Sequence, residues 1–147
     1  MSEAVLSKRT LRDVFKHFPA ETERALRFLV DDYELNGPEY TDIVLPAIAF
    51  MGSGVRYRVM LDLSDQVVLV HVEIDAGSGT LVAHLEDVVV KAGLAKPGIM
   101  SDRVHNLSTL HRALDSRAAY IRSLHPLLVG GAAIELMRKA GARERRG

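Results

Sequence analysis

The sequence predicts an α+β fold: two N-terminal helices, a three-stranded antiparallel meander, then two to three C-terminal helices packed on the sheet. Apolar residues recur every three or four positions before residue 34 and after residue 107, as in an amphipathic helix. Between Val55 and Ile74 they alternate with polar residues, as in a half-buried strand. Turns rich in glycine or proline separate the two kinds of segment.

The composition fits a single globular domain, 1–147, in which residues 141–147 form a frayed basic tail. The 19 basic and 19 acidic residues cancel, so we expect no nucleic acid partner. The absence of cysteine excludes disulfides and thiolate metal sites, and suits a cytoplasmic protein. No apolar run approaches the roughly 20 residues of a membrane helix, so we expect no membrane partner.

The two N-terminal helices are separated by a proline. The first is predicted from Glu3 to His17 and ends at Pro19, because proline lacks the N–H that would continue the helix. The second begins at Pro19, and its apolar stripe runs to Tyr33. The sequence Asn36-Gly37-Pro38 then predicts a turn.

The three strands follow. The first spans Ile43–Met51, and because Pro46 cannot donate a hydrogen bond to a neighbour, we place this strand at an edge of the sheet. Gly52-Ser53-Gly54 forms the next turn. The second strand, Val55–Leu63, lies in the middle and pairs on its other side with Val67–Ile74.

The side-chain pattern predicts the register of the second hairpin. A two-residue loop at Asp65-Gln66 places Tyr57 opposite Ile74 and Arg58 opposite Glu73, which gives one apolar face and one charged pair. A slip by one residue would turn one apolar set outward. Asp-Gln is not a favoured tight turn, so a slightly longer loop remains open.

Thr80 is expected to cap a helix over Leu81–Ala92 that Gly93 ends, with a strand as the alternative for Leu81–Leu85. A loop over Ala95–Asn106 comes next.

Asn106 is a candidate cap for the clearest helix, Leu107–Leu124, which Pro126 breaks. His125 lies near its end, where the helix dipole favours a positive charge. A last helix, Leu127–Ala140, is weakened by two glycines.

The second face of the hairpin mixes apolar and polar residues, so either a helix covers it or a partner binds there. The strand Val67–Ile74 is also a candidate free edge for strand addition. The candidate binding residues are Met60, Leu69, His71, Glu73 and Arg58. A solvated ion pair between Arg58 and Glu73 is the simpler interpretation of this face.

A second hypothesis involves metal binding. His111 and Asp115 are four residues apart, so both can point from one side of a helix, and Asp102 and His105 precede them in the loop. The four residues form a loose His/carboxylate set without the spacing of a zinc signature. An ordinary solvated helix face is the simpler explanation of these residues.

Three segments resemble a group of small actinobacterial-type α+β proteins: ERALRFLVDDYEL, VRYRVMLDLSDQVVLVHVEI and HLEDVVVKAG, which together span residues 23–93. The sequence departs from the group in carrying Glu34 where a glycine is usual. Some similar domains are immunity-type or accessory proteins encoded beside bacterial toxin or phage-related genes. The resemblance implies such a role and transfers no catalytic residue.

These observations favour a non-enzymatic cytoplasmic binding or accessory domain, immunity-like in type, with no cofactor and with another protein or itself as partner. One alternative is a small metal-dependent hydrolase or ligand-binding enzyme that uses the His/Asp set. The other is a structural homo-oligomer joined through the edges of its sheets.

Overall fold

The computed structural model describes residues 3–42 and 44–146, and the side chains from residue 10 onward within those ranges. Helix α1 (Glu3–Asp31) precedes strands β1 (Asn36–Asp42), β2 (Pro46–Gly52), β3 (Val55–Asp62), β4 (Val67–Asp75) and β5 (Thr80–His84). Helices α2 (Leu85–Lys91), α3 (Leu107–Leu128) and α4 (Ala133–Lys139) follow, and strand β6 (Arg143–Arg145) is the last element described. The α+β prediction is confirmed in this coarse form.

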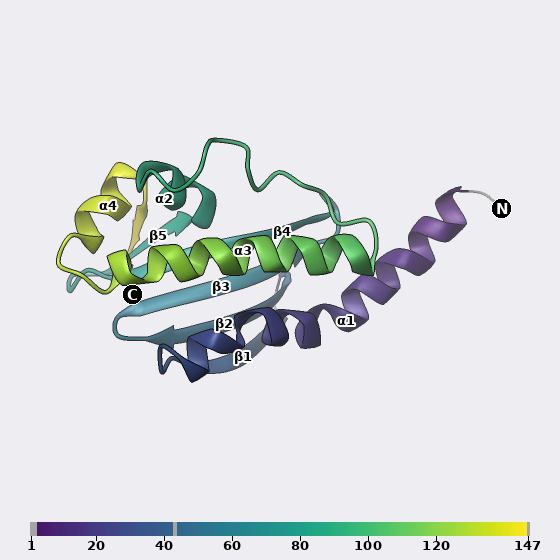
Figure 1. Ribbon diagram of the computed structural model, residues 1–147, viewed down its shortest axis with the longest axis horizontal. Helices are drawn as coiled ribbons and strands as arrows, with labels where there is room; N and C mark the ends of the chain where they lie inside the picture. The colour runs from purple at the N-terminus through teal and green to yellow at the C-terminus, as the bar shows by residue number, and fades with distance from the viewer. Residues whose placement is uncertain (1–2, 43, 147) are drawn as a thin grey trace.

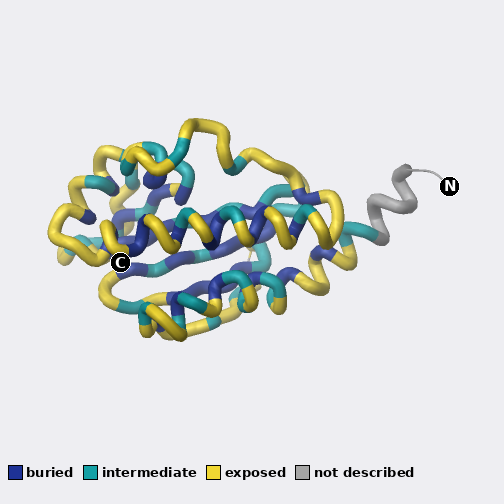
Figure 2. The backbone as a smooth tube through the Cα atoms, viewed as in Figure 1, coloured by how far each residue is buried: buried dark blue, intermediate teal, exposed yellow. Residues whose placement is uncertain are grey.

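The six strands form one antiparallel sheet in the order in which they occur along the chain. The helices lie together on one face of this sheet, with α1 and α3 packed against each other across its middle and α2 and α4 near β5 (Figure 1). The tube coloured by burial shows that the dark, buried stretches lie between these two layers (Figure 2). The domain is therefore two layers deep, helices over sheet.

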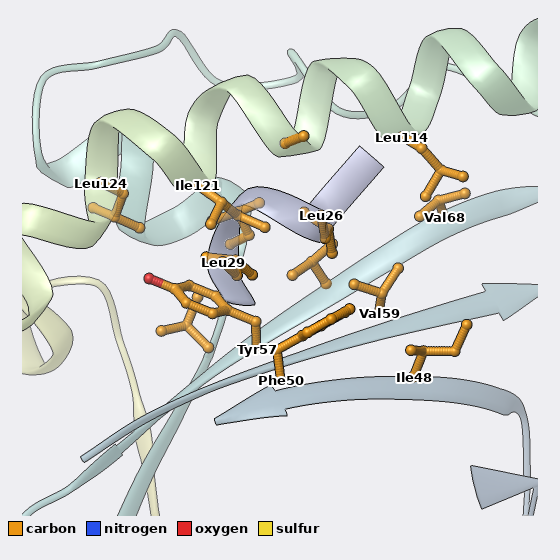
Figure 3. Packing of buried hydrophobic residues seen from close by; sticks show 14 of the residues in the cluster. Leu26, Leu29, Ile48, Phe50, Tyr57, Val59, Val68, Leu114, Ile121 and Leu124 are labelled. Atoms are coloured by element: carbon orange, nitrogen blue, oxygen red, sulfur yellow. The ribbon is translucent and has the colours of Figure 1, made fainter. Parts of the chain in front are cut away.

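The core lies between the helix layer and the sheet. Alternate residues of the strands, among them Phe50, Tyr57 and Val59, point into the core. They pack there against helix residues such as Leu26 of α1 and Ile121 of α3 (Figure 3). Alternation places the neighbouring residues of each strand on the other face. That second face contributes no residue to the core cluster of the described chain.

The helix boundaries predicted at the two prolines were wrong. Pro19 lies inside a continuous α1, because buried residues on both sides of it, such as Phe18 and Leu26, belong to one core-facing stripe. Pro126 likewise lies inside α3, and the last predicted helix begins only at Ala133. The predicted cap at Asn106 is correct: its side chain accepts a hydrogen bond from the Thr109 N–H at 2.8 Å.

The sheet is larger than predicted. Asn36–Asp42, expected to begin with a turn, forms β1 outside β2, so Pro46 opens an internal strand and not an edge strand. Thr80–His84 is β5, which confirms the strand alternative for most of Leu81–Leu85 over the favoured helix, and α2 begins only at Leu85. The expected frayed tail contains β6, which pairs with β5. Ile43, the predicted start of the first strand, lies outside the described residues.

The register of the β3–β4 hairpin differs from the prediction by two residues. Tyr57 lies opposite Val72, and Arg58 lies opposite His71. The loop comprises the four residues 63–66, because the Asp62 carboxylate accepts hydrogen bonds from the N–H groups of Ser64 and Asp65 and closes a wider turn. A two-residue shift leaves every side chain on its predicted face.

Candidate binding face

The second face of the sheet, which we call the open face, presents side chains from all six strands. Cross-strand pairing arranges them in rows. Its residues are Glu39, Thr41, Ala47, Ala49, Met51, Arg56, Arg58, Met60, Leu69, His71, Glu73, Val82, His84, Arg143 and Arg145. All five candidate binding residues lie on it.

One end of the open face is apolar. Ala47, Met60 and Leu69 are direct partners across β2, β3 and β4, and we call them the apolar row. A hollow of about 270 Å³ adjoins this row, lined in part by Ala47, Met60 and the 88 % exposed Val44. Met60 is 8 % exposed and Leu69 is half-buried. Apolar surface of this kind favours contact with another apolar surface.

The other end is basic. Four arginines, which we call the arginine cluster, extend from β3 and β6: Arg56, Arg58, Arg143 and Arg145. Arg143 and Arg145 reach this face because β6 pairs with Val82 and Thr80 of β5. A pocket of about 430 Å³, which we call the basic pocket, is lined by Arg58, His71, Val82, Arg143, Glu144 and Arg145.

A buried carboxylate lies beneath the arginines. Glu73 is only 3 % exposed, and its Oε1 accepts a hydrogen bond from Arg145 Nη2 at 2.8 Å. Its Oε2 lies 3.9 Å from Arg58 Nη1, within ion-pair range, without a hydrogen bond. Arg56 turns toward Glu39, 3.7 Å away. The cluster is thus partly neutralised, and Glu73 is structural as well as charged, since a buried carboxylate requires such partners.

Two histidines complete the basic end. His71 of β4 and His84 of β5 are cross-strand partners, and their rings meet edge to face with centroids 4.8 Å apart. Burial lowers the pKa of His71, and nearby His84, Arg58 and Arg143 lower it further, while Glu73 opposes them. His71 is therefore neutral at pH 7, with one ring nitrogen free to accept a proton.

The predicted metal set does not assemble. Asp102 pairs with the buried Arg117 at 2.7 Å, while His111 lies between Asp115 and Glu21 at 3.0 and 3.2 Å. The two carboxylates contact different ring nitrogens, which point apart and cannot converge on one ion. Among the side chains that the structure describes, no three His, Asp or Glu residues could hold a metal ion.

Four residues of the open face were not among the binding residues predicted from the sequence. Arg143 and Arg145 were placed in a frayed tail, and Val82 and His84 in a helix, with a strand only as the alternative. The sequence signal for β5 was weak, because Leu81, Val82 and Ala83 are all apolar; in the structure Leu81 and Ala83 are buried while Val82 and His84 are not. The predicted free edge at β4 is covered from His71 to Asp75 by β5.

No family model, curated protein or solved structure matches the chain. None of the described helices combines the length and apolar character required to cross a membrane.

Proposed function

We propose that the protein is a non-enzymatic, cytoplasmic binding domain whose open face receives an acidic, partly apolar segment of another protein. The observation that supports this most strongly is the juxtaposition of the apolar row and the arginine cluster on one sheet face outside the core. Apolar side chains beside arginine are typical of protein interfaces.

Charge complementarity selects the kind of partner. Arg58 and Arg143 line the basic pocket, whereas Glu73 is buried beneath it and Glu39 lies at the far edge on β1. A partner carboxylate at this end meets guanidinium groups, which bind carboxylates with two parallel hydrogen bonds. The partner's apolar side chains then lie over Met60 and Leu69. The immunity-type role implied by the sequence resemblance is one form of this function.

A peptide-display selection tests the proposal. The protein should enrich peptides that combine Asp or Glu with apolar residues, and their affinity is then measured by fluorescence anisotropy. Leu69→Ser should weaken binding at least about fivefold, because it removes apolar contact area. Leu127→Ser is the matched control, since Leu127 is 45 % exposed on α3, on the helix side.

Two results would count against the proposal. Selected peptides that lack acidic residues would contradict the proposed role of the arginine cluster. Equal losses of peptide affinity in Leu69→Ser and Leu127→Ser would show that the peptide does not bind the open face. Light scattering that shows a dimer disrupted by Leu69→Ser would make a second copy the occupant of the face, as in the homo-oligomer hypothesis.

A further inference from the structure

The basic pocket combines side chains from four strands around one volume. Arg58 comes from β3, His71 from β4, Val82 from β5 and Arg143 from β6. Because β6 follows α4 at the end of the chain, the pocket forms only when the C-terminal segment pairs with β5.

Some hydrogen-bond donors of the pocket have no acceptor within the described part of the protein. The Nε of Arg58 is buried and has no hydrogen-bond partner among the residues that the structure describes. Arg143 takes part in no ion pair with the part of the chain that the structure describes. Buried N–H donors without partners are costly, and a ligand acceptor relieves the cost.

The donors suit one kind of ligand. A guanidinium group presents parallel N–H bonds whose spacing matches the two oxygens of a carboxylate or a phosphoryl group. The carboxylate of Glu73 is held by Arg145 and occupies one such position from within the protein. Arg143 remains for an oxyanion that comes from solvent, and Arg58, whose only ion pair among the described residues is the 3.9 Å contact with Glu73 and lacks a hydrogen bond, can contribute to the same anion.

We infer that the basic pocket is an oxyanion subsite, in which Arg58 and Arg143 bind a carboxylate side chain of the partner segment. The inference rests on the proposed function and specifies the group that the partner inserts. His71 lines the pocket as well, and its neutral imidazole offers one ring N–H to a bound anion. Its surroundings are His84 on β5, Arg58 on β3, Glu73 on β4 and Arg143 on β6.

Sulfate is the probe for the subsite, because it is an oxyanion whose charge is constant near neutral pH. Sodium sulfate is titrated into ¹⁵N-labelled protein, with sodium chloride of matched ionic strength as the reference. We expect saturable shifts at Val82, at Arg143 and in the His71 ring, and binding at least about fivefold weaker in Arg58→Gln and Arg143→Gln. Arg112→Gln, an exposed arginine on α3, should bind sulfate like the wild type.

Arg143→Gln keeps the test decisive if Arg58→Gln fails to fold, since Arg143 is an exposed residue of a three-residue edge strand. Shifts equal to those with chloride, or sulfate binding unchanged in Arg143→Gln, would overturn the subsite. The selected peptides then separate the two proposals. If Leu69→Ser abolishes binding of a selected peptide and Arg143→Gln leaves it unchanged, the proposed binding function stands and only the oxyanion subsite is refuted. An acetylated glutamate peptide that fails to compete with sulfate would assign the pocket to free anions and overturn the assignment to a partner side chain.

Discussion

Replacing Tyr57 with phenylalanine should destabilise the protein through a single buried hydrogen bond. Tyr57 is 0 % and His125 is 4 % exposed, and their Oη and Nδ1 atoms are 2.6 Å apart. Burial raises the pKa of the Tyr57 hydroxyl and lowers that of the His125 imidazole, so both groups are neutral near pH 7. The tyrosine therefore donates, and the imidazole accepts at Nδ1.

The size of the effect follows from what the substitution leaves behind. Tyr57→Phe removes one neutral hydrogen bond, worth about 1 kcal/mol, and strands a buried ring nitrogen, which costs about 1–3 kcal/mol. These figures overlap, because part of the bond's worth is the avoided desolvation, so we expect a loss of about 2 kcal/mol. For a chain of this size that corresponds to a fall in Tm of about 4–8 °C.

Urea unfolding followed by circular dichroism measures this loss at neutral pH. His125→Leu alone should also destabilise the protein, because it leaves the buried Tyr57 hydroxyl without its hydrogen-bond acceptor. The double variant should lose about 1–2 kcal/mol less than the sum of the single variants, because the two groups are coupled. A Tyr57→Phe loss below about 0.5 kcal/mol, or simple additivity, would refute a buried Tyr57–His125 bond.

Three further predictions concern charged or titrating groups. Asp102→Asn should cost about 3 kcal/mol in urea unfolding, because it leaves the buried guanidinium of Arg117 without a counter-charge, whereas Arg117→Met removes that charge and should cost about 1–3 kcal/mol through the two backbone carbonyls that lose their donor; a loss below about 1 kcal/mol for Asp102→Asn would contradict this. Glu73→Gln should raise sulfate affinity a few-fold, because it removes negative charge beneath the basic pocket, and an unchanged or weaker affinity in the same titration would argue against the geometry. The pKa values of His71 and His125 are lowered in the folded state, so the unfolded chain binds more protons below about pH 6.5. Stability present above that pH is lost on acidification, and a urea midpoint that is flat or rising from about pH 7.5 to 5.5 would contradict the sign.

Periodicity predicted the parts of the fold that depend on which side of an element is buried. The faces of β3 and β4 were assigned correctly even though the register was wrong, because a shift of two residues preserves alternation. Asn106 was identified as a helix cap because the capping signal is local in sequence. The register itself depended on the loop, where the Asp62 carboxylate favours a wider turn than the residue pair suggested.

The missed elements gain their stability from tertiary contacts. β1 has the sequence NGPEYTD and mostly exposed side chains, so it carries no apolar alternation to detect. β6 is an exposed three-residue strand whose pairing with β5 is fixed by the position of α4. Pro19 was expected to end a helix, but the core contacts of Phe18 and Leu26 outweigh one missing hydrogen bond.

The candidate site was predictable only in part for the same reason. Met60, Leu69 and His71 lie within one hairpin, so alternation alone places them on a common face. The partners that turn this face into a pocket, Arg143 and Arg145, arrive from the other end of the chain. The burial of Glu73 beneath them could not be read from its own strand, where it looked like half of a solvated pair.

Methyl NMR with a selected acidic peptide tests the central claim most directly. Adjacent residues of β3 and β4 point to opposite faces, so Met60 and Leu69 report on the open face while Val59 and Val70 report on the core. Large, saturable shifts of the Met60 and Leu69 methyl groups, with the Val59 and Val70 methyls nearly unmoved, are the expected result. Shifts centred instead on methyl groups of α3 or α4 would show that the partner binds the helix layer and that the open face is not the binding surface.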